Sequence, residues 1–168
     1  MSGNAKSNAM FIIHGIGRMT QFQFNEPIAI PGAQQPIKLE NATLAQATIN
    51  LNNFNGKILI SATVGWFNTF TAAGVAAATF TIRRNGVPIA SVVQTVSNPT
   101  ATAATVSNVA RILFVDQPLT EILSMENGPV VAGDIRVTYE LTSDATDSTV
   151  ATTGPITLTI AEIEKSVV

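Results

Sequence analysis

The feature that most constrains this chain is an alternation of apolar and polar residues with a period of two. Residues 57–66 place Ile58, Ile60, Ala62, Val64 and Trp66 on one side of an extended chain. The same pattern recurs at 78–84, 135–142 and 156–160. Side chains on a strand point alternately to its two faces, so each segment predicts a strand with one buried face. Less regular strands are expected at 22–30, 43–51, 88–96 and 109–115.

The apolar phase of these segments also predicts which side chains form the core. We expect the buried set to include Ile58, Ile60, Val64, Trp66, Phe80, Ile82, Val137, Tyr139, Leu141, Leu158 and Ile160.

The turn residues agree with a chain of short strands. Asn85-Gly86 lies between two strand patterns, and Asn55-Gly56 lies between two others. Asn-Gly favours a two-residue hairpin turn, because both positions need a positive φ. The segments 95–107 and 142–153 are small and polar and are expected to be exposed loops or strand edges, and residues 119–125 form at most two helical turns. Eight or nine strands at this spacing predict an all-β fold, a jelly-roll β-sandwich of eight or more antiparallel strands.

Composition supports this fold and excludes several classes of function. Thr, Val and Ile make up 53 of the 168 residues (21, 15 and 17), which favours strands. The absence of cysteine excludes disulfides, a thiolate nucleophile and Cys-ligated metals. Nine basic and eleven acidic residues, with a net charge of −2, do not provide the basic surface that nucleic acids need. No apolar run approaches the roughly 20 residues of a membrane-spanning helix.

Candidate catalytic and cofactor-binding residues are scarce. His14 is the single histidine, and its glycine neighbour makes it a poor position for a catalytic base. Gly15-Ile16-Gly17 begins like a dinucleotide-binding motif, but Thr20 replaces the third glycine and no βαβ unit surrounds it. We therefore predict that the chain is not an enzyme and has no catalytic, cofactor-binding or metal-binding residues.

The acidic residues are likewise not expected to form a catalytic or metal-binding site. Asp144 and Asp147 share a Ser/Thr-rich segment that could offer oxygens to a weakly bound Ca²⁺, but two acids in such a loop are usually solvated. Glu162 and Glu164 alternate with Ile163 at the end of the last strand. They are predicted to lie on its solvent face and to discourage pairing with other edges.

Other polar and aromatic residues receive structural interpretations. Arg83 is predicted to point outward, and Arg84 to reach solvent around the Asn85-Gly86 turn. Trp66 and Tyr139 follow the apolar phase of their strands, which favours a core position over a sugar-binding platform. Asn41 begins a glycosylation sequon, which matters only in a eukaryotic secretory route.

The first 20 residues differ from the rest of the chain. A polar stretch at 1–9 precedes the apolar residues Met10, Phe11, Ile12, Ile13 and Ile16. This is not the pattern of a secretory signal peptide. We predict an arm at 1–20 followed by a sandwich domain at 21–168. Extended, about twenty residues reach ~65–70 Å, so the arm could pair with an open sheet edge of a neighbouring copy. The alternative is that residues 10–16 form the first strand of their own domain.

The strand and turn pattern resembles a known group of proteins. The relevant segments are Gly56 to Trp66, Phe80 to Ile89, Gly133 to Tyr139 and Gly154 to Ile163. They resemble the small jelly-roll proteins of the spore surface in Bacillus-type bacteria, both the endospore appendage fibre subunits and the C1q/TNF-like exosporium proteins. The resemblance implies a structural protein that assembles, with residues 1–20 in the place of the appendage connector. The chain departs from the appendage subunits in lacking their connector cysteines, and it has no collagen-like tract.

These observations together predict a self-assembling structural subunit of an extracellular filament, pilus-like fibre or spore-surface layer. The partner is expected to be the chain itself, with a surface-anchoring protein as a further possibility, and the location is the cell or spore surface. One alternative is a closed C1q/TNF-like trimer that acts as a coat component or binding head. A second alternative is a carbohydrate-binding jelly-roll module.

Overall fold

The computed structural model describes residues 18–28, 36–51, 56–117 and 135–164. Within them the chain forms eight strands: β1 (Arg18–Ile28), β2 (Ala42–Leu51), β3 (Lys57–Phe70), β4 (Gly74–Arg84), β5 (Val87–Asn98), β6 (Ala104–Asp116), β7 (Ile135–Ala145) and β8 (Ala151–Glu164). Every predicted strand segment falls within or largely within one of these strands. The described residues contain no helix that is long and apolar enough to cross a membrane.

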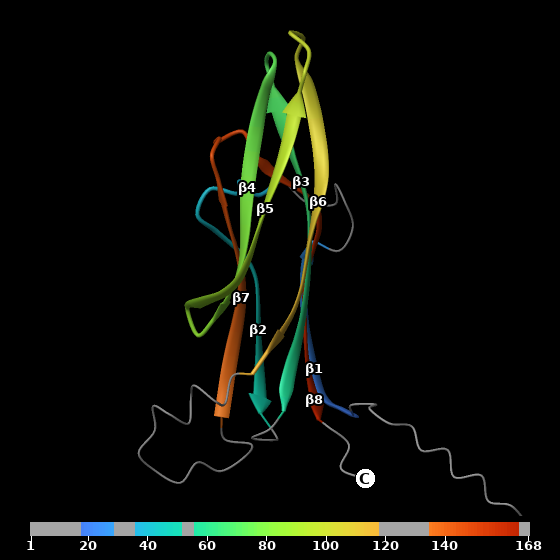
Figure 1. The fold of residues 1–168 in the computed structure, drawn as a ribbon, viewed down its shortest axis with the longest axis vertical. Coiled ribbons are helices and arrows are strands. Elements are labelled where there is room, and N and C mark those ends of the chain that lie inside the picture. The colour runs from blue at the N-terminus through green and yellow to red at the C-terminus, as the bar shows by residue number, and fades with distance from the viewer. Residues whose placement is uncertain (1–17, 29–35, 52–55, 118–134, 165–168) are drawn as a thin grey trace, which may run out of the picture.

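The strands form two four-stranded antiparallel sheets that pack face to face as a β-sandwich. One sheet has the order β1-β8-β3-β6 and the other β2-β7-β4-β5. In the lower half of Figure 1, β2 and β7 lie in one layer and β1 and β8 in the other. The first strand pairs with the last, β2 with β7, β3 with β6 and β4 with β5, and successive pairs alternate between the sheets. This is the connectivity of a jelly roll, so the predicted fold class is confirmed.

The innermost pair of this arrangement closes at the predicted Asn85-Gly86 turn. Asn85 has φ 48° and Gly86 has φ 82°, the positive values that a type I′ turn requires. The turn is also attached to β7, because the Asn85 N–H donates to the Thr138 carbonyl (2.8 Å) and the Thr138 N–H donates to Asn85 Oδ1 (2.9 Å). The local sequence Asn85-Gly86 therefore sets the position of the turn between β4 and β5, the innermost pair of strands.

The core lies between the sheets and contains the predicted residues. All eleven predicted core side chains are at most 1% exposed. Trp66 on β3 packs against Phe80 on β4, with 6.2 Å between ring centroids, and so joins the two sheets. The interpretation of Trp66 and Tyr139 as core residues is confirmed.

The two small, polar segments contribute more to the strands than their composition suggested. β5 continues to Asn98 and β6 begins at Ala104, which leaves only 99–103 as a connection. Similarly, β7 reaches Ala145 and β8 begins at Ala151. Threonine is tolerated on the outer face of a strand, so Thr-rich composition does not by itself indicate a loop. Asn55 and residues 119–125 lie outside the described residues, so the second Asn-Gly turn and the short helix stay predictions.

Candidate functional site

The predicted assembly arm lies outside the described residues. This applies to Met10, Phe11, Ile12, Ile13 and Ile16, and also to His14. The first described strand, β1, begins at Arg18, close to the predicted boundary between arm and domain. The division at residues 20 and 21 and the role of the arm stay predictions.

The surfaces that the structure does describe include four free sheet edges. β5 and β6 each pair along one side only, with β4 and β3 respectively, and the same holds for β1 and β2 at the opposite side of the sandwich. β5 and β6 run for 12 and 13 residues. Their free sides present backbone N–H and C=O groups to which another strand can bind.

The edges at β5 and β6 carry few of the charges that usually protect such strands. β5 contains no charged residue, and the two charged residues of β6 are Arg111, which is exposed, and Asp116, which is buried. Proline occurs only near the start of β5, at Pro88. β5 also has one register shift, between the partners of Ile82 and Arg83 near its start. Long and nearly uncharged edges favour pairing with further strands.

One sheet also exposes large apolar side chains on its outer face. Met19, Phe22 and Phe24 on β1 are 48–60% exposed, and Leu113 and Val115 on β6 are 74% and 50% exposed. The rings of Phe22 and Phe24 are 5.9 Å apart. Exposed apolar side chains grouped in this way mark interaction surfaces more often than isolated ones do.

The outward position of Phe22 and Phe24 was not predicted from the sequence. Gln21, Gln23 and Asn25 pair with Glu162, Ile160 and Leu158, which are all fully buried. Gln21, Gln23 and Asn25 therefore share the phase of these buried β8 residues, although Gln23 is itself exposed. Asn25 Nδ2 donates across the sandwich to the Gln46 carbonyl (3.0 Å). The phenylalanines take the outward phase by alternation.

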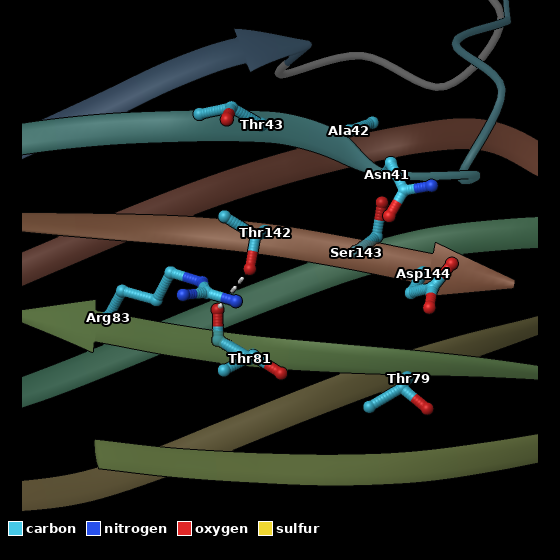
Figure 2. A pocket seen from close by; sticks show the side chains of 9 residues that line it. All are labelled: Asn41, Ala42, Thr43, Thr79, Thr81, Arg83, Thr142, Ser143 and Asp144. Carbon is cyan, nitrogen blue, oxygen red and sulfur yellow. Dashed lines mark hydrogen bonds between the residues drawn. The ribbon is translucent and has the colours of Figure 1, made fainter. Parts of the chain in front are cut away.

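The outer face of the other sheet contains a shallow pocket of about 340 Å³. It is lined by Asn41, Ala42, Thr43, Thr79, Thr81, Arg83, Thr142, Ser143 and Asp144 (Figure 2). The Thr142 hydroxyl donates to the Thr81 carbonyl (3.3 Å), and Arg83 Nη1 donates to the Gly86 carbonyl (3.0 Å). The hydroxyls could bind a polar ligand, but no aromatic ring lines the pocket and no nucleophile is paired with a base.

The aspartates of the β7–β8 region do not converge. Asp144 Oδ1 accepts the N–H of Ala145 (2.9 Å), and Asp147 Oδ1 accepts the backbone N–H (2.9 Å) and the hydroxyl (2.8 Å) of Thr149. These bonds lower the pKa of Asp147, the backbone bond being the larger cause. Among the described residues, no group of three His, Cys, Asp or Glu side chains is placed to hold a metal.

Arg84 is buried, so the prediction that it reaches solvent is wrong. It is 8% exposed, and its Nη1 donates to both carboxylate oxygens of Asp116 at 2.8 and 3.1 Å. The Tyr139 hydroxyl donates to the same carboxylate (2.8 Å). Burial raises the pKa of Tyr139 far above its usual value, and the negative charge and hydrogen bond of Asp116 raise it further. Arg84 continues the inward phase of Phe80 and Ile82, and its partner lies on the opposite sheet.

Glu162 is also buried, which corrects its predicted place on the solvent face. It is 0% exposed and follows the inward phase of Leu158 and Ile160, and the Thr20 hydroxyl donates to its Oε2 (2.7 Å). β8 is an interior strand between β1 and β3, so Glu162 does not protect an edge. Nothing is described for the side chain of Glu164.

Comparison with known proteins gives little beyond this geometry. The chain matches no family model, and no relative is found among curated proteins. Among solved structures it is similar to dimeric latent PorU from Porphyromonas gingivalis, with 10% sequence identity and a TM-score of 0.42. The match covers 98% of this chain but only 14% of that one.

Proposed function

We propose that this protein is a self-assembling structural subunit that joins copies of itself by strand addition into an extracellular filament or spore-surface layer. The observation that carries the proposal is the pair of long, nearly uncharged edge strands, β5 and β6, on one side of the sandwich. In strand addition, main-chain hydrogen bonds supply affinity, so an open and regular edge is the main requirement.

The low charge of the chain supports the same function. Only 12% of its residues are charged, about half of the roughly 25% that is usual for soluble domains. A surface with few charges offers less resistance to association. The residues outside the described part include Phe11, Ile12 and Ile13, which could occupy an edge of a neighbouring copy. The extracellular or spore-surface location comes from the sequence resemblance.

The runner-up is a closed trimer of the C1q/TNF kind. The exposed apolar side chains on the outer face of β1-β8-β3-β6 favour it, because a closed ring would bury a sheet face. Negative-stain microscopy separates the two: the proposed subunit forms fibres or sheets of open-ended length, whereas the trimer forms discrete particles of one size.

Lysine on the edge strand tests strand addition. The double variant Ser91→Lys/Thr95→Lys places two charges on exposed positions of β5 and should abolish multimers while the sandwich stays folded. The control is Thr79→Lys, on the interior strand β4 directly beside Val93 of β5. Multimers are measured by size-exclusion chromatography and folding by circular dichroism. Equal assembly of the edge variant and the control would argue against β5 as an acceptor.

Deletion of residues 1–16 tests the arm. If the arm is the connector, the truncated chain keeps its cooperative unfolding but no longer forms multimers. A truncated chain that still assembles, or one that does not fold, counts against the connector.

A further inference from the structure

The outer face of the β1-β8-β3-β6 sheet has an ordered arrangement of side chains. The strand register places Phe22, Ala161, Leu59 and Val115 in one row across the four strands. The alternation of the strands puts all four on the outer face. The row thus begins and ends with a large, exposed apolar side chain at the two sheet edges.

The next row repeats this distribution. Phe24, Thr159, Ser61 and Leu113 are paired in register across the same four strands. Phe24 and Leu113 are 60% and 74% exposed. In both rows the aromatic residue is on β1, the aliphatic residue is on β6, and at least one small residue lies between them.

Opposite charges lie at the same two edges, one row further on. Arg111 of β6 pairs with Thr63, which pairs with Thr157 of β8. Glu26 of β1 follows Asn25, the partner of Leu158, and lies in the segment between Asn25 and Ile28 where the register shifts, close to the level of Thr157. Both Glu26 and Arg111 are exposed. The face therefore carries an acid at its β1 edge and a base at its β6 edge.

We propose that this face binds the same face of a second copy, about a twofold axis that runs parallel to the strands between β8 and β3. Such an axis exchanges the β1 edge of the face with the β6 edge. Each row keeps its position along the strand direction. β1 of one copy then lies over β6 of the other. The contact is isologous, so every pairing occurs twice.

The pairings made by this axis are complementary in shape and charge. Phe22 faces Val115 of the other copy, Phe24 faces Leu113, and Glu26 faces Arg111. A twofold axis across the strands would reverse the order of the rows. Centred on the Phe24 row, it would place Phe24 over Phe24, but Glu26 over Phe22 and Arg111 over Val115. The axis parallel to the strands instead faces each charge with an opposite charge, and this complementarity favours it.

The size of the face is sufficient for a stable contact. Four strands about 4.8 Å apart and about twelve residues long, at roughly 3.3 Å per residue, present about 750 Å² on each copy. A standard interface uses about 800 Å² per partner. Sheets packed face to face lie about 10 Å apart and cross at about 30°. The contact deepens the proposed self-assembly, and it uses neither a strand edge nor the arm.

Charge reversal on the full chain tests the pairing. Glu26→Arg or Arg111→Glu alone creates two like-charge pairs per dimer, and each should raise the dimer dissociation constant by about tenfold or more in sedimentation equilibrium. The double variant Glu26→Arg/Arg111→Glu restores opposite charges and should return to within about threefold of the original. Arg136→Glu, an exposed reversal on the outer face of the other sheet, is the control and should change nothing.

Cysteine cross-linking tests the axis, since the natural chain contains no cysteine. Phe24→Cys and Leu113→Cys are made separately and treated with a short bismaleimide. The proposed axis predicts cross-linking when the two variants are mixed and little with either alone. Cross-linking of Phe24→Cys with itself would overturn the axis.

Each remaining outcome also decides the question. Assembly that is unaffected by the single reversals overturns this contact while leaving strand addition standing. A full chain that is monomeric, and that dimerises only after deletion of residues 1–16, shows that the arm covers the face and overturns the proposal. A chain that is monomeric in both forms overturns it as well, and the proposed function with it.

Discussion

At the scale of single residues, the most consequential group is the buried contact of Arg84, Asp116 and Tyr139. Arg84 and Tyr139 come from the β2-β7-β4-β5 sheet and Asp116 from the other, so the three side chains connect the two layers. A buried ion pair adds little to stability relative to apolar residues, but removing one partner leaves the other charge without compensation.

Asp116→Ala should therefore be strongly destabilising. It leaves the Arg84 guanidinium and the Tyr139 hydroxyl without this acceptor, and we expect the free energy of unfolding to fall by about 3–5 kcal/mol. Urea denaturation measures the change. Asp144→Ala, which removes an exposed carboxylate, is the control and should stay within about 0.5 kcal/mol. Similar losses of unfolding free energy in the two variants would show that the buried contact contributes no more to stability than an exposed carboxylate.

Tyr139 should make the protein sensitive to alkali. Its folded-state pKa is raised above the unfolded value of about 10, so the contribution of its neutral form is fully present below pH 10 and is lost as the pH rises further. Tyr139 is the single tyrosine of the chain, so phenolate absorbance reports it alone. We expect no phenolate signal above pH 10 until circular dichroism shows unfolding. Ionisation of Tyr139 near its ordinary pKa in the folded state would contradict this.

Gly65 is required by a close backbone contact. A Cβ on this residue of β3 would overlap the carbonyl oxygen of Gly154 on β8. Gly65→Ala should therefore force the two strands apart and destabilise the protein by about 3 kcal/mol or more. Gly74→Ala is the matched control, because its nearest neighbour is the Phe70 ring at 3.4 Å. Thermal unfolding of both variants measures the difference, and equal midpoints would contradict the expected clash.

At the scale of elements, the strands and most of the core could be predicted because alternation is a local property. All eight segments appear, and residues such as Ile58 and Leu158 have the burial that their phase indicates. The predicted solvent positions of Arg84 and Glu162 are wrong because they follow from the charge of these side chains. The alternation along β4 and β8 places both residues on the inward face. Their partners, Asp116 and Thr20, are distant in sequence. Phe22 and Phe24 face outward because β1 pairs with β8 in a register that aligns Gln23 and Asn25 with the buried Ile160 and Leu158, and only the strand pairing reveals that register.

The β4–β5 turn offers a test at this scale. Gly86 has φ 82°, and a Cβ added to it would meet no atom within 4 Å, so Gly86→Ala changes backbone strain without creating a clash. We expect a loss of about 1–2 kcal/mol, the usual difference for a left-handed position. Asn85→Gly should retain the turn but lose the bond from Thr138. Chemical denaturation measures both, and an unchanged Gly86→Ala would show that the turn does not need its positive φ.

At the scale of the whole molecule, the two sheets present different outer faces. One has a threonine-lined outer face with a shallow polar pocket and the exposed valines Val75 and Val93, and the other exposes Phe22, Phe24 and Leu113. Free edges run along both sides of the sandwich. A candidate assembly surface of this kind cannot be derived from sequence periodicity, because it depends on which strands become edges and which rows come into register.

The central claim, that the chain associates with itself, is tested most directly by sedimentation velocity on the purified full-length protein across a concentration series. We expect species larger than the 17.6 kDa monomer, with the average size rising as concentration rises. A single monomeric species at every concentration, from a protein that circular dichroism shows to be folded, would contradict it.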